Sequence, residues 1–418
     1  MSSRTQGGQA GSSQDGPNQV GPNQVGSNQV GSGQVGSEPA SYATDHTRQV
    51  EALDALYCEA GLVRHRRGSK SNVLRAARES IRTPEELRPA LNGVEHRARN
   101  GSLCLSVPAW ESESWLWHGF STRQGGVSQT YCGENAAGEL NLGFTAEDEA
   151  ANVAENRRRL AEAVTSSRAT PLAVLRQIHS HHIVDTGSAA QVSRVARGGD
   201  QINSQNSQGE REDTAAVNDI ASKIAILARG DGLMTDQPGV LLAIQTADCV
   251  PVLVADRRRR VVAAFHAGWR GTVGRIVESG IGRMRLKFGS APEDLIAAVG
   301  PAIGPCCYAV GEEVLSEFES QFSYYRELIH EVYETDSVRT RYPMLFLTQR
   351  APGHSEIGPA LHLDLAAANR RQLLDAGVLS NAIQMMGGCT RCDREMFFSH
   401  RGSDGRAGRM MSVIGIQG

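Results

Sequence analysis

The segment GVLLAIQTADCVPVLVADRRRRVVAAFHAGWRG, residues 239–271, predicts the central strands of the fold. It contains three short runs in which almost every residue is apolar: Val240–Ile244, Val250–Val254 and Val261–Phe265. Continuous apolar runs of this length predict strands that are buried on both faces. We therefore expect the sheet formed by these strands to be covered by other layers on both sides.

The connection between the second and third runs predicts a β-hairpin. The segment Asp256–Arg260 is too polar for a core and too short for a crossover helix. If Ala255 pairs with Arg260 across a four-residue loop, Cys249 lies opposite His266. Opposed residues of an antiparallel pair share a face, with Cβ atoms about 5 Å apart. That spacing allows a thiolate and an imidazole to share one metal ion, and a slip of one residue would prevent it.

The segment after the hairpin and a histidine-rich segment elsewhere in the chain contain further candidate functional groups. After His266, glycine-rich residues lead into a helical run over residues 272–288, whose first backbone amides can face an anion. A third metal ligand is expected from QIHSHH, residues 177–182, and three protein ligands with an open fourth position are typical of catalytic zinc. Two other interpretations stay open. Cys249 can be a nucleophile activated by His266, as in thiol hydrolases, or both can be core residues.

Composition excludes several classes of function. The 418 residues include 43 Lys+Arg and 46 Asp+Glu, and the formal net charge of −3 gives no basic footprint for nucleic acid or acidic membranes. No window reaches the roughly 18 consecutive apolar residues that span a bilayer. The first residues contain no apolar export segment, so the eight cysteines are expected to be reduced thiols of a cytoplasmic protein.

The N-terminal quarter is expected to lie outside the catalytic domain. Residues 1–43 are interpreted as a disordered tail, because residues 16–35 repeat a five-residue unit that is poor in core-forming side chains. Residues 44–106 are predicted to form a helical extension with a solvated basic face. Within it, Thr83-Pro84-Glu85-Glu86 has the pattern of a helix start with a capping box.

The catalytic domain is expected over residues 107–418, with two insertions. The first, at about 188–228, is almost wholly polar over residues 198–213 and is interpreted as a surface loop. The second, at about 316–360, contains four of the eight tyrosines and is expected to be folded, with a lid over a pocket as one option.

Ten blocks of sequence between His118 and the C-terminus carry a resemblance to one family. The chain resembles the laccase-domain proteins, also labelled multicopper polyphenol oxidoreductases, which are purine nucleoside phosphorylases with adenosine deaminase activity. The order and number of the blocks make this resemblance specific, and it covers roughly three quarters of the chain. The blocks are HGFSTRQGGVS (118–128), NLG (141–143), NVAENR (152–157), QIHSHHIV (177–184), TADCVPVLVAD (246–256), HAGWRGT (266–272), GPAIGPCCY (300–308), LDLAAANRRQLLDAGV (363–378), CTRCDREMFFSHR (389–401) and GRAGRMMSVIGI (405–416).

The resemblance implies both a fold and a catalytic set. The fold is α+β, a four-layer α/β/β/α sandwich with mixed sheets. The metal-binding catalytic residues fall on His179, Cys249 and His266, while His181 and His182 match variable positions and are expected to be exposed. The metal is expected to be zinc, with copper possible at the same thiolate and imidazoles. The substrates implied are phosphate and purine nucleosides, namely adenosine, inosine, guanosine and methylthioadenosine.

Phosphorolysis needs an anion site, and deamination needs a proton shuttle. Arg270 is the first candidate for phosphate binding, followed by Arg123 and Arg401. Asp248 is the candidate acid or base, although strand alternation points it away from the metal unless the backbone turns there. The sequence departs from the family near the site. His400-Arg401-Gly402 stands where the family has Tyr and two Arg, and Ala309 stands where it usually has Glu.

The same residues are compatible with alternative functions. A cysteine hydrolase that edits peptidoglycan precursors would use the same Cys249, and a non-catalytic scaffold would rely on the tail and insertions. A polyphenol oxidase with bound copper would need many imidazoles in HxH pairs, and the chain offers one such pair, His179 and His181. Cys306-Cys307 and the Cys389-x-x-Cys392 motif are expected to be packed thiols, because no further CxxC completes a four-ligand site. The sequence predicts no oligomeric state.

Overall fold

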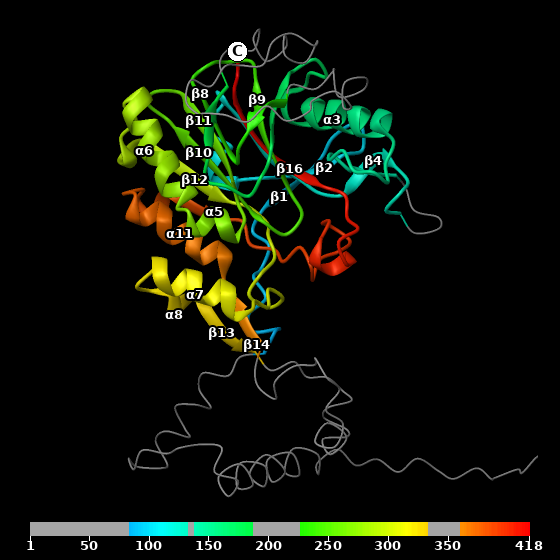
Figure 1. The fold of residues 1–418 in the computed structure, drawn as a ribbon. Helices are drawn as coiled ribbons and strands as arrows, with labels where there is room; N and C mark the ends of the chain where they lie inside the picture. Colours follow the sequence, from blue (N-terminus) through cyan, green and yellow to red (C-terminus); the bar gives the residue numbers. More distant parts are fainter. Residues whose placement is uncertain (1–82, 133–137, 187–225, 333–359) are drawn as a thin grey trace, which may run out of the picture. The chain divides into compact units, whose positions relative to one another are not determined.

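Two mixed β-sheets lie face to face in the described part of the chain (Figure 1). The computed structural model describes residues 83–132, 138–186, 226–332 and 360–418, all of which belong to a unit that begins at Ser71. The expected tail, most of the expected helical extension and the polar insertion therefore lie outside the described residues. So does the second half of the tyrosine-rich insertion.

The first sheet has seven strands in the order β1-β2-β3-β16-β9-β5-β7. The pairs from β1 to β9 are antiparallel, and β5 is parallel to both β9 and β7. The strands are β1 (Val94–Arg97), β2 (Leu103–Ser106), β3 (Leu116–Ser121), β16 (Met410–Ile416), β9 (Leu241–Thr246), β5 (Leu172–Arg176) and β7 (Ile226–Arg229).

The second sheet has six strands in the order β15-β12-β10-β11-β8-β6. Its two outer pairs are parallel, and the three inner pairs are antiparallel. The strands are β15 (Ile383–Met385), β12 (Leu295–Val299), β10 (Val250–Asp256), β11 (Val261–Ala267), β8 (Gly232–Thr235) and β6 (Ile183–Asp185). A separate pair is formed by β13 (Ile329–Val332) and β14 (Ala360–Leu363), and β4 spans Gln124–Ser128.

Helices cover the outer face of each sheet. The α-helices are α3 (Ala150–Thr165), α5 (Trp269–Val273), α6 (Ile276–Phe288), α7 (Glu312–Gln321), α8 (Tyr325–Leu328) and α11 (Leu365–Asp375). Short 3-10 turns occur at Pro108–Trp110, Pro292–Asp294, Ser380–Ala382 and Arg401–Ser403. In Figure 1, α6 and α11 lie on one side of the sheets and α3 lies on the other. No helix among the described residues is both long and apolar enough to cross a membrane.

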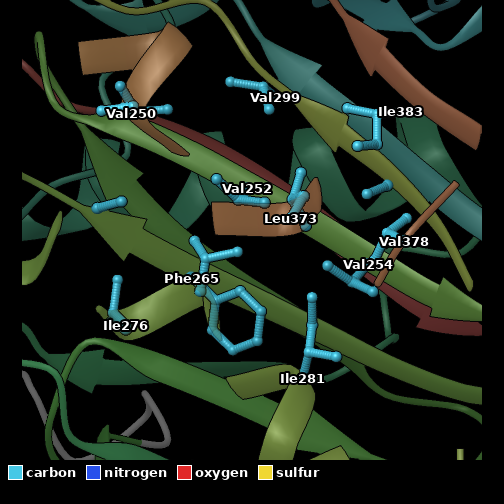
Figure 2. Close-up of a cluster of buried hydrophobic side chains, with 14 of the residues drawn as sticks. Val250, Val252, Val254, Phe265, Ile276, Ile281, Val299, Leu373, Val378 and Ile383 are labelled. Carbon is cyan, nitrogen blue, oxygen red and sulfur yellow. The ribbon is translucent and has the colours of Figure 1, made fainter. Parts of the chain in front are cut away.

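Three apolar clusters separate these layers. Alternate residues of β10 and β11 serve two clusters, as expected of strands buried on both faces. Leu253 and Ala264 face the seven-stranded sheet. Val252 and Phe265 instead face α6 and α11, where Ile281 and Leu373 meet them (Figure 2). A third cluster packs α3 on the outer face of the seven-stranded sheet. The order of layers is therefore α/β/β/α, which confirms the predicted fold class.

The C-terminal end of the predicted helical extension is not helical. Residues 94–97 and 103–106 form β1 and β2 of the seven-stranded sheet. The capping-box hydrogen bonds between Thr83 and Glu86 do form, at 3.1 and 3.3 Å, but the chain makes only one turn there. Pro89 follows two residues after Leu87, and the residue that precedes a proline disfavours the helical conformation. The helical prediction was therefore wrong for this segment.

The described part of the tyrosine-rich insertion is folded. It contains most of α7, the short helix α8 and strand β13. Phe318, Phe322 and Leu328 are buried in the cluster that covers the outer face of the six-stranded sheet. The segment is thereby anchored to the core.

Candidate active site

The β10–β11 hairpin places Cys249 near His266, but in a register that differs from the prediction. Asp256 pairs with Val261, so the four-residue loop is Arg257–Arg260 and His266 lies opposite Pro251. Asp256 belongs to the strand because its buried carboxylate accepts hydrogen bonds from two loop amides, each at 2.9 Å. The shift between the two registers is an even number of residues, so it does not change which face a side chain points to.

Cys249 lies one residue before β10, in the segment Ala247–Cys249 that links the two sheets. The predicted opposition of Cys249 and His266 was wrong, yet both side chains meet on the same side of the hairpin. Gly268 lies beside them, and a Cβ there would approach the Cys249 sulfur to 3.1 Å and the His179 ring to 3.2 Å. The glycine of the HAGWRG block therefore leaves space for the two side chains.

His179 completes the group. The ligand atoms of His179, Cys249 and His266 all lie within 4.8 Å of one another. The rings of His179 and His266 meet edge to face, with centroids 4.9 Å apart. His179 has a φ of 58°, in the left-handed region, so the chain turns sharply after β5 at this residue.

A buried carboxylate that the sequence analysis did not identify holds this group in place. Asp231 lies between β7 and β8 and is fully buried. Its Oδ1 accepts hydrogen bonds from His266 Nδ1 at 2.8 Å and from the His179 amide at 3.0 Å. Its Oδ2 accepts from the amide and hydroxyl of Ser180 at 2.6 and 2.7 Å. The signal in the sequence is one acidic residue between two glycines, immediately before an apolar strand.

The ionisation states of these residues depend on one another. Burial opposes the charge of Asp231, but hydrogen bonds from His266 and Ser180 outweigh it and lower the pKa to about 2. Burial also disfavours the charged form of His266, yet Cys249 and Asp231 raise its pKa to about 9. The same pairing, together with a hydrogen bond from His179, overcomes burial and lowers the pKa of Cys249 to about 6. The site therefore favours a thiolate.

The donor set fits a single soft or borderline metal ion. One thiolate and two imidazoles are ligands that zinc and copper prefer. The bond to Asp231 engages Nδ1 of His266 and leaves Nε2 as the atom that can bind a metal. A carboxylate behind a ligating histidine is the usual outer-shell partner of zinc sites.

The group opens onto a cavity of about 700 Å³, a size suited to a small organic molecule. Its lining contains aromatic, aliphatic, amide and guanidinium groups. The lining residues are Phe144, Arg157, Val174, Leu175, Arg176, Gln177, His179, Gln245, Thr246, Ala247, Asp248, Cys249, His266, Trp269, Arg270, Ile303, Tyr308, Leu365, His400, Arg401 and Arg409.

Two of the three arginines predicted to bind phosphate line this cavity. Arg270 is exposed and stacks on the Trp269 ring at 4.2 Å, and it has no acidic partner in an ion pair within the described ranges. Arg401 donates to the Ala309 carbonyl at 3.0 Å and lies over the Tyr308 ring. Arg123 does not line the cavity. It is paired with Glu139 and donates to two carbonyl groups.

Arg157, which the sequence analysis did not select, is a cavity residue of a different kind. Its side chain is buried, Nε donates to the Leu142 carbonyl at 2.9 Å, and the guanidinium lies over Phe144. Nη1 has no hydrogen-bond partner in the described structure. Burial lowers the pKa of Arg157 to about 9. A buried guanidinium with a free donor at the wall of a cavity is suited to an anionic ligand.

Asp248 lies in the cavity wall because the backbone does turn at this residue. Its φ is 96°, and its side chain is buried. Oδ1 accepts from the Thr390 hydroxyl at 2.7 Å, and Oδ2 accepts from the Arg401 amide at 2.6 Å. Asp248 therefore joins two loops of the wall. Of the other two histidines in the QIHSHH segment, His181 is exposed and His182 is partly buried, and neither lines the cavity.

The chain is similar in sequence and in structure to known proteins of one family. The sequence profile of a family described as "Multi-copper polyphenol oxidoreductase laccase" matches residues 117–417. The purine nucleoside phosphorylase YlmD of Geobacillus stearothermophilus is 33% identical over 316 residues, which cover 73% of this chain and 95% of that protein. An adenosine deaminase from an unknown prokaryotic organism is 34% identical over 196 residues, covering 47% of this chain and 66% of that protein. The crystal structure of YlmD from Geobacillus stearothermophilus superposes with a TM-score of 0.56 at 29% identity, covering 78% of this chain and 100% of that one.

Proposed function

The chain belongs to the multi-copper polyphenol oxidoreductase laccase family, and on that basis we propose that it is a zinc-dependent purine nucleoside phosphorylase with adenosine deaminase activity. One observation carries the proposal. A Cys/His/His donor group, backed by Asp231, lies at the wall of a cavity of about 700 Å³ that is large enough for a nucleoside and is also lined by several guanidinium groups. The names of the relatives supply the substrate class, and this cavity has the chemistry for such a substrate.

Phosphorolysis forms a bond between a phosphate oxygen and C1′ of the ribose while the bond from C1′ to the purine breaks. The purine leaves with the electron pair of that bond and takes up a proton. Phosphate must therefore be held beside a ribose that develops positive charge. Arg270, Arg157 and Arg401 all line the cavity, and Arg157 Nη1 has no hydrogen-bond partner among the described residues, so these guanidinium groups are the candidates to hold the phosphate.

Deamination forms a bond between C6 of adenine and the oxygen of a water molecule and breaks the bond from C6 to the amino group, which leaves as ammonia. A zinc ion bound by His179, Cys249 and His266 would supply Lewis acidity and an activated water for this reaction. Asp231 fixes the tautomer and orientation of His266, and it positions the His179 backbone. We propose Asp248 as the acid or base of this step, a role in which it would exchange one of its two present hydrogen bonds for one to substrate.

A cysteine hydrolase is the second candidate, because the geometry also matches a thiolate, an imidazolium and an orienting carboxylate. Cys249 and His266 favour their charged forms, and Asp231 binds the other nitrogen of the histidine. Alkylation separates the two candidates. A free nucleophilic thiolate reacts quickly with iodoacetamide at neutral pH, whereas a thiolate bound to metal reacts only after the metal is removed.

The decisive assay incubates metal-quantified protein with adenosine or inosine, with and without phosphate, beside Cys249→Ala. We expect ribose 1-phosphate and free base only when phosphate is present, and neither product with Cys249→Ala. Inosine formed from adenosine without phosphate would report deamination separately. Release of base that does not depend on phosphate and survives Cys249→Ala would refute the phosphorylase proposal.

A further inference from the structure

A second cluster of metal-binding atoms lies outside the candidate active site. The sulfur atoms of four cysteines, two from a Cys-Cys pair and two from a CxxC motif, lie within 4.8 Å of one another. The sequence offered no second CxxC, and the fold supplies the missing pair from a segment more than 80 residues away along the chain. The four residues are Cys306, Cys307, Cys389 and Cys392.

The spacing of these sulfur atoms fits a single ion. Cys392 Sγ lies 3.6 Å from Cys306 Sγ and 3.4 Å from Cys307 Sγ. Four thiolates in a tetrahedron around zinc, each about 2.3 Å from the metal, have sulfur atoms about 3.8 Å apart. An iron–sulfur cluster would spread its cysteines more widely than one ion does.

The backbone on both sides of the cluster is shaped to present the sulfur atoms. Ala302 pairs with Cys389 in an isolated parallel bridge, and the Thr390 amide donates to the Ala302 carbonyl at 3.0 Å. The Gly304 amide donates to the Cys389 sulfur at 3.3 Å, a hydrogen bond that stabilises a thiolate. The Asp393 amide donates to the Cys389 carbonyl at 2.9 Å, so the CxxC segment closes into one turn.

Burial and charge around the cluster also suit a closed site. Cys306 and Cys389 are buried with Ile303, whereas Cys392 is exposed and provides an entry path for an ion. Four thiolates around a divalent cation leave two negative charges. Arg88 lies next to the cluster in an ion pair with Asp393.

Disulfide bonds explain this arrangement less well than a metal. None of the seven described cysteines is in a disulfide. Cys306 and Cys307 both have Cys392 as a near sulfur neighbour, so the cluster is not divided into two separate pairs. A group of mutually close thiols is what a tetrahedral ion requires.

We propose a structural zinc site, separate from the candidate active site, formed by Cys306, Cys307, Cys389 and Cys392. Four protein ligands leave no open position, which is typical of structural zinc. The ion holds together two loops of the cavity wall. Tyr308 directly follows Cys307 and lines the cavity, and Thr390 directly follows Cys389 and donates to Asp248. The site is thus a positioning device for the cavity and does not itself touch substrate.

Metal content and metal ligation test this proposal without an activity assay. In the full chain carrying Cys249→Ala, which removes one ligand of the active-site group, we expect about one tightly bound zinc per chain. Zinc X-ray absorption of that protein should show four sulfur neighbours at about 2.3 Å and no nitrogen. Adding Cys392→Ser, at the exposed ligand, should abolish tight binding, whereas adding Cys132→Ser should leave the zinc in place.

The X-ray absorption measurement keeps the proposal falsifiable if Cys392→Ser does not fold. Nitrogen or oxygen neighbours in the Cys249→Ala protein, or no bound zinc, would overturn it. So would zinc retention in folded Cys249→Ala/Cys392→Ser, or a non-reducing intact mass that shows disulfides among these cysteines. Because every readout is metal or mass, a failed phosphorolysis assay would leave this inference unaffected.

Discussion

Asp231 holds both histidines of the candidate active site, one through its ring and the other through its backbone amide. We expect Asp231→Asn to lower the metal affinity and the rate of phosphorolysis by about 10- to 100-fold, which is the usual effect of removing a carboxylate that hydrogen-bonds a metal ligand. Dialysis against a graded chelator, followed by metal analysis, measures the affinity. Asp236→Asn, at an exposed acidic residue just after β8, is the matched control. Equal metal affinity in the two variants would contradict this role for Asp231.

Arg157 and Arg158 are adjacent on α3 but lie in opposite environments. Arg157 is buried at the cavity with an unpaired Nη1, whereas Arg158 is largely exposed. If the proposed phosphorolysis is correct, Arg157→Met should raise KM for phosphate roughly 10- to 100-fold, the value of one hydrogen bond to a charged group. Arg158→Met should change it little. Steady-state kinetics at varied phosphate concentration measure this KM, and the Tm of each variant checks that it is folded. An unchanged KM in folded Arg157→Met would contradict the proposed anion site.

For individual residues, the sequence could identify the candidate metal ligands but not the residues that surround them. His179, Cys249 and His266 stand in specific sequence blocks, so the resemblance implied them. Asp231 gives only a lone acid between glycines. Arg157 belongs to a run of three arginines on a helix, where a solvated face is the usual outcome. Whether such residues are buried depends on strands that are distant in the sequence, and local sequence patterns carry no information about how those strands pack.

Helix α6 can lie close to the six-stranded sheet because Gly280 has no side chain. A Cβ at this position would overlap the Phe265 ring of β11, whereas a Cβ at Gly282 of the same helix meets nothing within 4 Å. We expect Gly280→Ala to lower the free energy of unfolding by about 1–3 kcal/mol through overpacking. Gly282→Ala should raise it by up to about 1 kcal/mol, since alanine favours the helix. Urea unfolding measures both, and a stable Gly280→Ala protein would show that the ring can move aside.

Among the elements, the apolar runs of residues 239–271 were predicted correctly as strands because continuous burial leaves a strong pattern. Strand β1 was missed for the opposite reason, whereas β2 was missed although three of its four residues are buried. All four residues of β1 are exposed, so it carries no apolar alternation, and its Arg and Glu residues are typical of a helix. The hairpin register was displaced because Asp256 looks like a loop residue until its hydrogen bonds are known.

The stability of the whole molecule should depend on pH through His118. Its Nε2 accepts the Val107 amide at 3.1 Å, and burial lowers the pKa to about 4 from 6.5. Below pH 6.5 the unfolded chain binds a proton at His118, whereas the folded chain binds this proton only below about pH 4. The free energy of unfolding therefore falls as the pH decreases through this window.

His118→Gln isolates this contribution. Between pH 7 and pH 5 the wild-type protein should lose about 2 kcal/mol more of its free energy of unfolding than His118→Gln does. Parallel urea titrations at the two pH values give the difference, and all other titrating groups cancel between the variants. Identical pH dependence in both proteins would mean that His118 is not held neutral by the fold.

The four-layer architecture followed from strands buried on both faces together with the family resemblance, and both were right. The cysteine cluster was not foreseeable in this way. Its two halves are separated by more than 80 residues, and the pairing of β12 with β15, continued by the bridge between Ala302 and Cys389, brings them together.

The path of the chain between β9 and β10 has a consequence for the energetics of the whole fold. Cys249 lies where the chain crosses from one sheet to the other, His179 follows a strand of the first sheet, and His266 belongs to the second. A metal ion bound by all three residues would link the two sheets to each other. Because binding and folding are thermodynamically linked, the free energy by which the ion stabilises the packing of the two sheets equals the free energy by which correct packing increases the affinity for the ion. Loosening the inter-sheet core far from the cavity, for example at Leu253, should therefore be detectable as weaker metal binding.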